Sequence, residues 1–501
     1  MRYRVIGMYL YIIVIVVMLC SCSNMDSTTY KDESANVTTN STNTNTDSQK
    51  QDKVTTLTLV QKDFSPYNNE DNEYIQEINK TLIENNIQAK LELVELPKGD
   101  YSEQLKNIID SGNAPDIIWF RDGMDKDISN KGQLVNLTKY VNDSDVFQNS
   151  MESYHKTRIQ NYPYLLRIRY NTPKIAAVRK DWLDSLSLSV PVTVDDYYNV
   201  LKAFANSDFD DNGKKDTYGI TATGDTTRLD DVFNTAFGLP TTWVKNENDS
   251  YVYSRVTHNE KEKLLFYRKL MEEHILDPNY GTTKWDTMEE KLYNGKVGMI
   301  IGSSGKVIDI YNRKLIDNEV NTELIALHPP KGKEGLAGFA PINVNGEERG
   351  FAISSTCENI DLAFTVLEFM ASDKGQFLDR LGIEGREYNI DSNGKVICTN
   401  KANQWYARFF DVPSWESPIP LLSEIAKQSL QITESYYIED NSFNIPKEYK
   451  SKWESMNKLY REYSYKIISG EYELNKFDEF VDKWYMMGGK EITELANKTI
   501  K

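Results

Sequence analysis

The stretch that decides the fold runs from Ala176 to Ile220 and reads AAVRKDWLDSLSLSVPVTVDDYYNVLKAFANSDFDDNGKKDTYGI. Its apolar beginning predicts a strand, and the segment after Pro191 predicts a helix. Thr193 is a suitable N-cap, and the two aspartates that follow it fall in the first turn, where the helix dipole favours negative charge. One face of this helix is apolar, made of Tyr197, Val200, Leu201 and Phe204. We therefore expect a strand followed by a helix that buries one side.

Directly after that helix, the segment DFDDNGKKD has the spacing of a calcium-binding loop. Gly213 stands where such loops need a sharp turn, and calcium prefers about six to eight oxygen ligands. The bidentate Glu that usually closes the loop is replaced by Gly219. The alternative is an Asx-rich turn without metal. The predicted ligands are Asp208, Asp210, Asn212, Asp216 and the backbone carbonyl of Lys214.

Three features of this stretch together resemble a known family. They are the RKDWL segment, the proline-threonine step into a helix that ends near Phe204, and the D-x-D-x-NG-KKDTYG loop. The resemblance is to the extracellular solute-binding lipoproteins of ABC sugar importers, in the branch that includes the alginate-oligosaccharide-binding proteins. It extends over nearly all of residues 54–501. In that branch the loop binds a structural calcium and often has a Glu after its last Asp; here Thr217 or a water would have to replace it.

The resemblance implies a fold and a function. The fold would be a type II periplasmic-binding-protein fold, α/β, with two lobes that close by hinge motion and a helical C-terminal region. The first lobe would comprise residues 54–168 plus 330–385, and the second residues 169–329 plus 386–501. The function would be capture of an oligosaccharide outside the cell and delivery to the permease subunits of an ABC transporter, by a monomer that carries out no covalent chemistry.

The N-terminus reads as a lipoprotein signal peptide over residues 1–21. Arg2 and Arg4 precede an apolar run, and a small residue stands before Cys22. Cleavage before Cys22 would leave a thiol for diacylation, for example with palmitate, and would anchor the chain to the outer face of the cytoplasmic membrane of a Gram-positive cell. The polar residues 22–53 then predict a disordered tether. The alternative is an uncleaved single-span anchor, for which the apolar run is short.

The composition is that of a soluble globular chain long enough for two lobes. Of 501 residues, 40% are hydrophobic and 27% charged, and the net charge is −17. Such an excess of acid disfavours nucleic acids and anionic membranes as partners. Apart from the cysteines at the signal, only Cys357 and Cys398 remain, and the sequence leaves open whether they pair.

The first hundred residues after the tether alternate between strand and helix patterns. Strands are expected over residues 56–62, 89–96 and 116–120, with helices between them, which predicts a parallel sheet. Ligands of such sheets bind beyond the carboxyl ends of the strands. Trp119, Arg121 and Asp122 lie at such an end and are therefore candidate ligand-binding residues.

Sequence motifs favour binding over catalysis. The four histidines stand apart from one another, and neither HExxH, GxSxG nor a phosphate-binding glycine loop occurs, so we predict no catalytic residue and no enzyme. The 8 Trp and 31 Tyr suit a sugar ligand, whose C–H faces pack on aromatic rings. A surface glycan-active enzyme, a ligand-presenting sensor lipoprotein and a peptide-binding importer subunit are the alternatives. The candidate ligand-binding residues are Trp119, Arg121, Asp122, Trp243, Trp285, Ser303, Trp405 and Tyr406.

Overall fold

The structure, a computed structural model, describes residues 53–62, 64–121, 123–209, 212–347 and 349–500. The predicted signal peptide, Cys22 and nearly all of the tether lie outside the described residues, as do Asp122 and Asp210. From Lys53 onward the chain forms one compact unit. None of the helices in the described part is long and apolar enough to cross a membrane.

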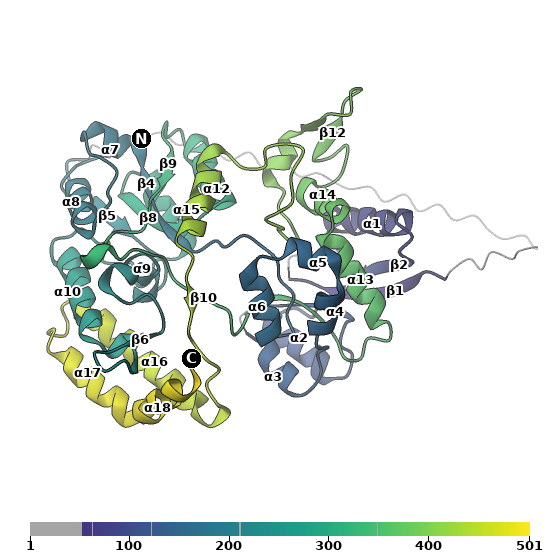
Figure 1. Cartoon of the computed structure of the whole chain (residues 1–501). Helices are drawn as coiled ribbons and strands as arrows, with labels where there is room; N and C mark the ends of the chain where they lie inside the picture. The colour runs from purple at the N-terminus through teal and green to yellow at the C-terminus, as the bar shows by residue number, and fades with distance from the viewer. Residues whose placement is uncertain (1–52, 63, 122, 210–211, 348, 501) are drawn as a thin grey trace, which may run out of the picture. The chain divides into compact units, whose positions relative to one another are not determined.

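The first lobe is built on a four-stranded sheet in the order β11-β3-β1-β2. The three strands expected from the sequence, β1 (Thr55–Val60), β2 (Ala89–Leu93) and β3 (Ile117–Phe120), are parallel as predicted. The fourth, β11 (Gly350–Ile353), returns from far along the chain and pairs antiparallel with β3. The helices of this lobe (Figure 1) are α1 (Asn69–Glu84), α2 (Tyr101–Asp110), α3 (Asp125–Asn130), α4 (Thr138–Asp143), α5 (Asp145–Ser150), α6 (Ser153–Asn161), α13 (Ile360–Ala371) and α14 (Asp373–Leu381).

The second lobe is built on another four-stranded sheet, in the order β5-β8-β4-β9. Here β5 (Tyr218–Thr221) is parallel to β8 (Val297–Ser303), and β4 (Lys174–Arg179) is antiparallel to both β8 and β9 (Leu324–Ala326). Its helices include α7 (Lys180–Ser185), α8 (Val194–Ala205), α9 (Thr226–Phe233), α10 (His258–Glu272), α11 (Trp285–Tyr293), α12 (Lys306–Asp317) and α15 (Glu424–Ser435). A hairpin of β6 (Trp243–Lys245) and β7 (Tyr251–Tyr253) and the C-terminal helices α16 (Lys447–Ile468), α17 (Lys476–Trp484) and α18 (Lys490–Thr499) pack onto it.

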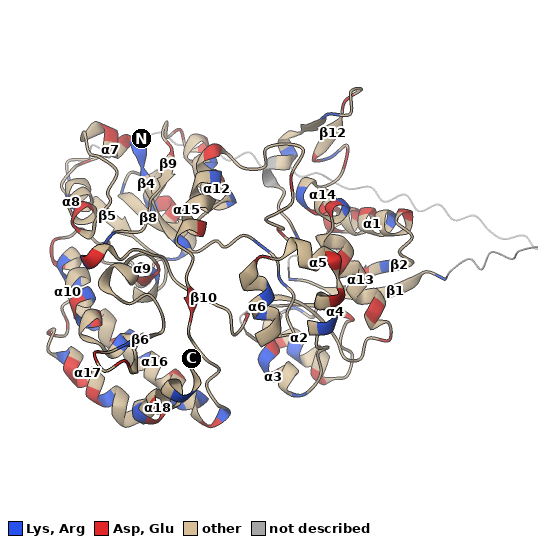
Figure 2. Ribbon diagram, viewed as in Figure 1, with Lys and Arg blue, Asp and Glu red and all other residues tan. Residues whose placement is uncertain are grey.

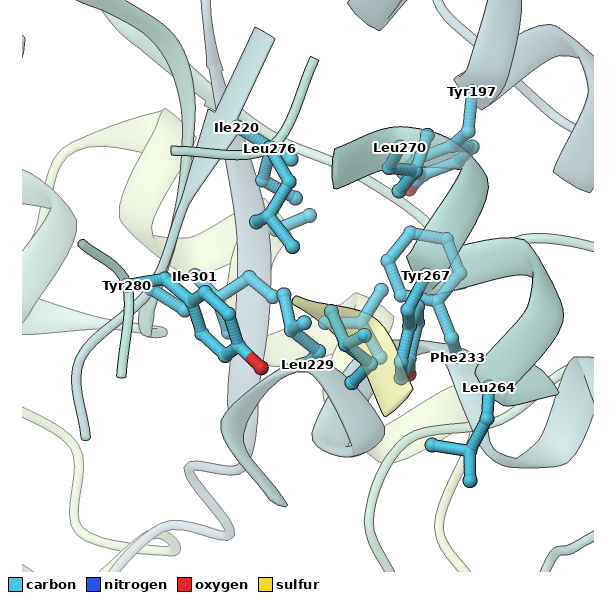
Figure 3. Close-up of a cluster of buried hydrophobic side chains, with 14 of the residues drawn as sticks. Tyr197, Ile220, Leu229, Phe233, Leu264, Tyr267, Leu270, Leu276, Tyr280 and Ile301 are labelled. Atoms are coloured by element: carbon cyan, nitrogen blue, oxygen red, sulfur yellow. The ribbon is translucent and has the colours of Figure 1, made fainter. Parts of the chain in front are cut away.

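The stretch quoted first folds as the sequence predicts. The Thr193 hydroxyl accepts a hydrogen bond from Asp196 N at 3.1 Å, and the Asp196 carboxylate accepts one from Thr193 N at 2.9 Å, which is a complete capping box. The predicted apolar face of α8 is buried. Figure 3 shows Tyr197 of this face with Phe233, Tyr267 and Leu270 in the core of the second lobe.

A buried charge network joins the C-terminal helices to this core. Lys263 on α10 lies 2.7 Å from Asp230 on α9 and 2.9 Å from Glu260, and all three side chains are at most 2% exposed. Glu260 also accepts a hydrogen bond from the Tyr460 hydroxyl on α16 at 2.7 Å. Buried charges are stable only when paired and hydrogen-bonded, so this network fixes how α9, α10 and α16 meet. Along α17 both lysines and acidic residues colour the ribbon (Figure 2), while Phe477, Phe480 and Trp484 of the same helix are buried in the core.

The chain passes between the two lobes at three places, residues 169–173, 341–349 and 413–423. Next to the second crossing, Glu347 forms ion pairs with Arg158 at 2.6 Å and Arg167 at 2.9 Å. The short strand β10 (Ile342–Asn343) pairs in parallel with β14 (Glu439–Asp440). The two-lobed α/β architecture expected from the sequence is therefore present.

Core packing differs from the expected lobe boundaries. Residues 386–412 were expected in the second lobe, but Phe409, Phe410 and Val412 lie in the same cluster as Leu57 and Phe351 of the first. The reason is that buried polar groups of α14 bind this irregular segment. Asp379 accepts hydrogen bonds from the backbone N–H groups of residues 408, 409 and 410, at 2.8, 2.9 and 3.0 Å. The hairpin of β12 (Tyr388–Ile390) and β13 (Val396–Cys398) packs there too, through Tyr388 and Val396 beside Leu381.

At the other expected boundary, residue 330, the packing also differs. Phe339 was expected in the first lobe but packs with Ile300 and Leu324 of the second. The two cysteines of the folded part do not pair: Cys357 is buried in the first-lobe core and Cys398 is exposed on β13.

Candidate ligand-binding site

A cavity of about 410 Å³ lies where the lobes meet at the first crossing. Its walls come from residues 169–172 of the crossing, 304–310 of the second lobe, 402–411 and Arg380 of the first lobe, and 421–430. We call this cavity the hinge cleft. A neighbouring cavity of about 760 Å³ shares several of the same lining residues. The shared residues are Tyr170, Arg380, Leu421, Leu422 and Leu430.

The position of the hinge cleft follows from the topology. Strands β5 and β8 are parallel, and β4 is antiparallel to β8, so the carboxyl end of β8 and the start of β4 share one edge of the second sheet. Ser304 and Gly305 follow β8 at that edge and lead into α12. The site thus lies beyond a strand end and at a helix start, as ligands of α/β sheets do.

Two predicted aromatic residues line the hinge cleft together. Trp405 is held in place, because its indole N–H donates to the Asp379 carbonyl at 2.9 Å and its ring meets Tyr74 edge-on at 4.9 Å. Tyr406 is 50% exposed, and the guanidinium of Arg408 lies 4.3 Å from its ring centroid. A fixed indole beside an exposed phenol is an arrangement on which a sugar ring can pack.

Trp285 lies at the same sheet edge as the Ser303 backbone and is not among the residues that line the hinge cleft. Ser303 ends β8 and is in register with Lys174, the first residue of β4. The ammonium of Lys174 lies 5.2 Å from the Trp285 ring centroid, and the indole N–H of Trp285 donates to Glu289 at 2.9 Å. The structure thus brings Trp285 and Ser303 to one place, beside a lysine that the sequence analysis did not select.

The remaining predicted residues lie elsewhere. Trp119, on β3, packs edge-on against Phe351 at 4.7 Å, and Arg121 follows that strand. Trp243 is only 1% exposed and packs against Tyr253 and Trp453 in the second-lobe core, although it borders another cavity of about 1380 Å³. The expectation that Trp243 offers its ring to a ligand therefore needs correction. Because Trp243 lies on the hairpin β6–β7, its side chain points into the second-lobe core.

The hinge cleft also holds charged residues that the sequence analysis missed. Arg380 pairs with Asp411 at 2.6 Å, and Arg169 donates to the Thr172 hydroxyl at 2.9 Å. Burial, and secondarily the charge of Arg167, lowers the pKa of Arg169 to about 10. Arg380 lies inside α14 with no motif around it, so no local signal could have found it. Ser304 could have been found with Ser303, because both follow the same strand.

The loop predicted to bind calcium is a compact Asx-rich turn. Both carboxylate oxygens of Asp208 accept backbone hydrogen bonds, from Asn212 N at 3.2 Å and Gly213 N at 2.7 Å. The Asn212 amide lies 3.1 Å from an oxygen of Asp216, and Lys296 binds the same carboxylate at 2.9 Å. Gly213 has φ +73°, the turn conformation that this loop position requires.

These residues fit a calcium ion in part. Asp208, Asn212 and Asp216 carry oxygens within one short loop, but those of Asp208 and Asn212 accept backbone hydrogen bonds and the Asn212 amide nitrogen faces Asp216. The Thr217 hydroxyl is buried with no hydrogen-bond partner among the described residues. Within the described ranges, which omit Asp210, no group of three His, Cys, Asp or Glu side chains is placed to hold a metal. The described residues alone therefore do not make a metal site, and the predicted ligand Asp210 lies outside them.

Comparison with known proteins gives the family. The pattern of the bacterial extracellular solute-binding proteins matches residues 68–377, more than half of the chain. The chain belongs to this family. The predicted resemblance is thereby confirmed, and the family of this solute-binding protein is one of binding proteins.

Two relatives come from Bacillus subtilis (strain 168). Lipoprotein LipO is 25% identical over 450 residues, which cover 80% of this solute-binding protein and 84% of LipO. The polygalacturonan/rhamnogalacturonan-binding protein YtcQ is 25% identical over 451 residues, covering 84% and 87% of the two chains. Among solved structures, that of the alginate-binding protein AlgQ2 without calcium ion matches with a TM-score of 0.66 at 16% identity, covering 90% of this chain and 98% of AlgQ2. The fold is therefore the two-lobed fold of this family, as predicted.

Proposed function

We propose that this protein is the substrate-binding lipoprotein of an ABC importer, which captures an oligosaccharide in the hinge cleft and delivers it to the permease subunits. The observation that carries the proposal is the pairing of Trp405 and Tyr406 with polar groups in a cavity that draws its walls from both lobes. Such a site binds a ligand between two lobes, and closing around it favours the bound form. The carbohydrate-binding names of the relatives support the same ligand class.

Attachment through a diacylated Cys22 belongs to the same proposal. A lipid anchor and a polar tether would hold a monomer at the outer face of the cytoplasmic membrane, within reach of the permease. The lipoprotein name of one relative supports this arrangement.

The test is a thermal melt of the purified full-length protein against plant, algal and host oligosaccharides, with peptides as controls. A ligand at about 100 times its Kd should add roughly 2.7 kcal/mol to the free energy of unfolding. The Trp405→Ala variant should lose this shift, because it removes the fixed indole wall. Tyr67→Ala, an 82% exposed aromatic away from the cleft, serves as the matched control and should keep it.

Three other results would contradict the proposal. Stabilisation by peptides alone would indicate a peptide importer. Conversion of the sugar on incubation would indicate an enzyme. An unchanged shift in Trp405→Ala would place the ligand outside the hinge cleft.

We further propose a structural calcium in the loop after α8, bound by Asp208, Asp210, Asn212, Asp216 and the carbonyl of Lys214. Calcium would tie the loop together whatever the substrate, since its ligands come from one short segment. A chelator should therefore lower Tm, and Asp208→Ala should abolish the difference between chelated and calcium-loaded protein. Lys296→Gln, which removes a cation that contacts Asp216 and leaves every proposed ligand in place, should retain that difference. Equal Tm values with and without chelator would refute the calcium site.

A further inference from the structure

Helix α12 begins inside the hinge cleft without a side-chain cap. It is 12 residues long and starts at Lys306 after Gly305; among the described residues no side chain caps it, and of its first-turn N–H groups that of Ile308 donates to the Gly305 carbonyl at 3.0 Å. The N–H groups of a first turn have no acceptor within the helix, and the helix dipole makes this end positive. The helix start is held in place, because Gly305 N donates to the Ser429 hydroxyl on α15 at 2.7 Å.

A buried hydroxyl lies unpartnered at the same place. Ser304, the residue before the N-cap, is 1% exposed and lines the hinge cleft. Its Oγ has no hydrogen-bond partner within the described residues. A buried hydroxyl without a partner costs free energy, which a ligand oxygen at this position would recover.

The charges of the hinge cleft have the opposite sign to those of the whole chain. Its lining contains Arg169, Lys306 and Arg380 as cations and Asp411 as the single carboxylate, which Arg380 already pairs with. Lys306 forms no ion pair within the described part of the chain. The chain as a whole has a net charge of −17, so a positive cleft in this setting favours an anionic ligand.

We infer that the hinge cleft contains an anion subsite at the N-terminus of α12, formed by Ser304 and Lys306 with Arg169 and Arg380, and that the captured ligand is an acidic oligosaccharide. The inference rests on the proposed function and adds the substrate class. The anionic group is a carboxylate of a uronic acid or a sulfate ester, since both present oxygens to backbone N–H groups and cations. The lowered pKa of Arg169 fits this role, because a neighbouring anion would offset the cost of burying its charge.

The test compares acidic oligosaccharides with neutral forms of the same sugars. Isothermal titration of the full-length protein would use oligogalacturonates and oligoalginates, their methyl esters, sulfated oligosaccharides, and the desulfated forms. The acidic form should bind at least ten-fold more tightly than its neutral counterpart, with a difference that shrinks as salt rises. Carboxylated and sulfated sugars are titrated in separate experiments, so the result identifies which anionic group the protein binds.

Two variants then place the subsite. Lys306→Gln and Ser304→Ala should each weaken binding of the acidic sugar and leave binding of its ester unchanged. Arg313→Gln is the matched control on the same helix. Arg313 is 64% exposed and pairs with Asp317 at 3.1 Å, so its removal should change binding of neither the acidic sugar nor its ester. A melt without ligand shows whether each variant is folded, and the comparison of acid with ester in the unaltered protein needs no variant.

Each contrary result has a distinct meaning. Equal binding of acid and ester, or tighter binding of neutral sugars, would overturn the anion subsite and leave the oligosaccharide function in place. No binding of any oligosaccharide, acidic or neutral, would overturn the proposed function and this inference with it. Loss of ester and acid binding together in Lys306→Gln would assign that lysine a structural role and refute the subsite.

Discussion

At the scale of single residues, some positions leave no room for a side chain. Gly219 on β5 lies so close to α8 that an added Cβ would be 2.4 Å from the Leu201 carbonyl oxygen, and the backbone there cannot move aside easily. The glycine that stands where calcium loops have Glu is thus required by helix packing. From the sequence alone Gly219 was interpreted only as the loss of a calcium ligand. Its role in packing against α8 could not be predicted, because a close backbone contact leaves no local pattern in the sequence.

Gly219→Ala should therefore destabilise the protein by about 1–3 kcal/mol, as overpacking of a core does. Urea unfolding measures the change. Gly346→Ala is the control, because its nearest contact would be the Asn343 side chain at 3.5 Å. Equal stability of both variants would show that α8 can shift away from β5.

His155, at the start of α6 beside the first crossing, makes stability depend on pH. It is 2% exposed and its ring accepts a hydrogen bond from Arg169 N at 3.3 Å; burial, and then the charge of Arg158, lowers its pKa from 6.5 to about 3. Below about pH 6.5 the histidine is therefore protonated in the unfolded chain but stays neutral in the folded one. Stability is thus lost as the pH falls from about 6.5 towards 3.

Each pH unit in that window should cost up to about 1.4 kcal/mol through this residue. Between pH 7 and pH 5 the unaltered protein should lose about 2 kcal/mol more than His155→Gln, by urea unfolding at both values. His258→Gln, a 79% exposed histidine, is the control and should behave like the unaltered protein. Parallel losses in all three would exclude His155 as the source.

At the scale of elements, periodicity and capping predicted most of what the structure contains. The helix after Thr193, the strand before it and the three parallel strands of the first lobe have strong local patterns. Residues 405–412 have none, since they form neither helix nor regular strand and depend on backbone hydrogen bonds to Gln376 and Asp379. Their packing in the first lobe could not be predicted locally, although Trp405 was selected as a candidate ligand-binding residue because it is an aromatic outside regular elements.

The network of α9, α10 and α16 gives a test at the same scale. Lys263→Met would leave Asp230 and Glu260 buried with one cation fewer, which should cost about 3–5 kcal/mol in urea unfolding. Lys261→Met on the same helix removes a partly exposed pair with Asp478 and should cost under about 1 kcal/mol. A loss of similar size in both variants would mean that the network adds no more than a surface pair.

At the scale of the whole molecule, the three crossings make the lobes interdependent. Glu347, with a side chain 8% exposed, neutralises both Arg158 and Arg167 next to the second crossing. The family resemblance predicted two lobes that close on a hinge, but not this ion-pair group, because Glu347 is far along the chain from Arg158 and Arg167.

Glu347→Gln should destabilise the protein by about 3 kcal/mol, since two largely buried guanidinium groups lose their shared partner. Thermal and urea unfolding would measure it. Glu272→Gln, which breaks a pair with Arg268 whose carboxylate is 57% exposed, is the control and should cost less. Unchanged stability in Glu347→Gln would show that water solvates the charges of both arginines well enough to replace the carboxylate.

The return of β11 and of residues 409–412 to the first lobe also sets the order in which the molecule can be completed. An exported chain emerges with its N-terminus first, so β3 is outside the cell before its neighbour β11 has followed. Until then the first sheet has an unpaired edge and an open core, which are the features that lead to association with other chains. We expect the first lobe to finish folding only after the strands of the second sheet and residues 409–412 have been translocated, so that the lobe begun first stays open while most of the second lobe is already outside.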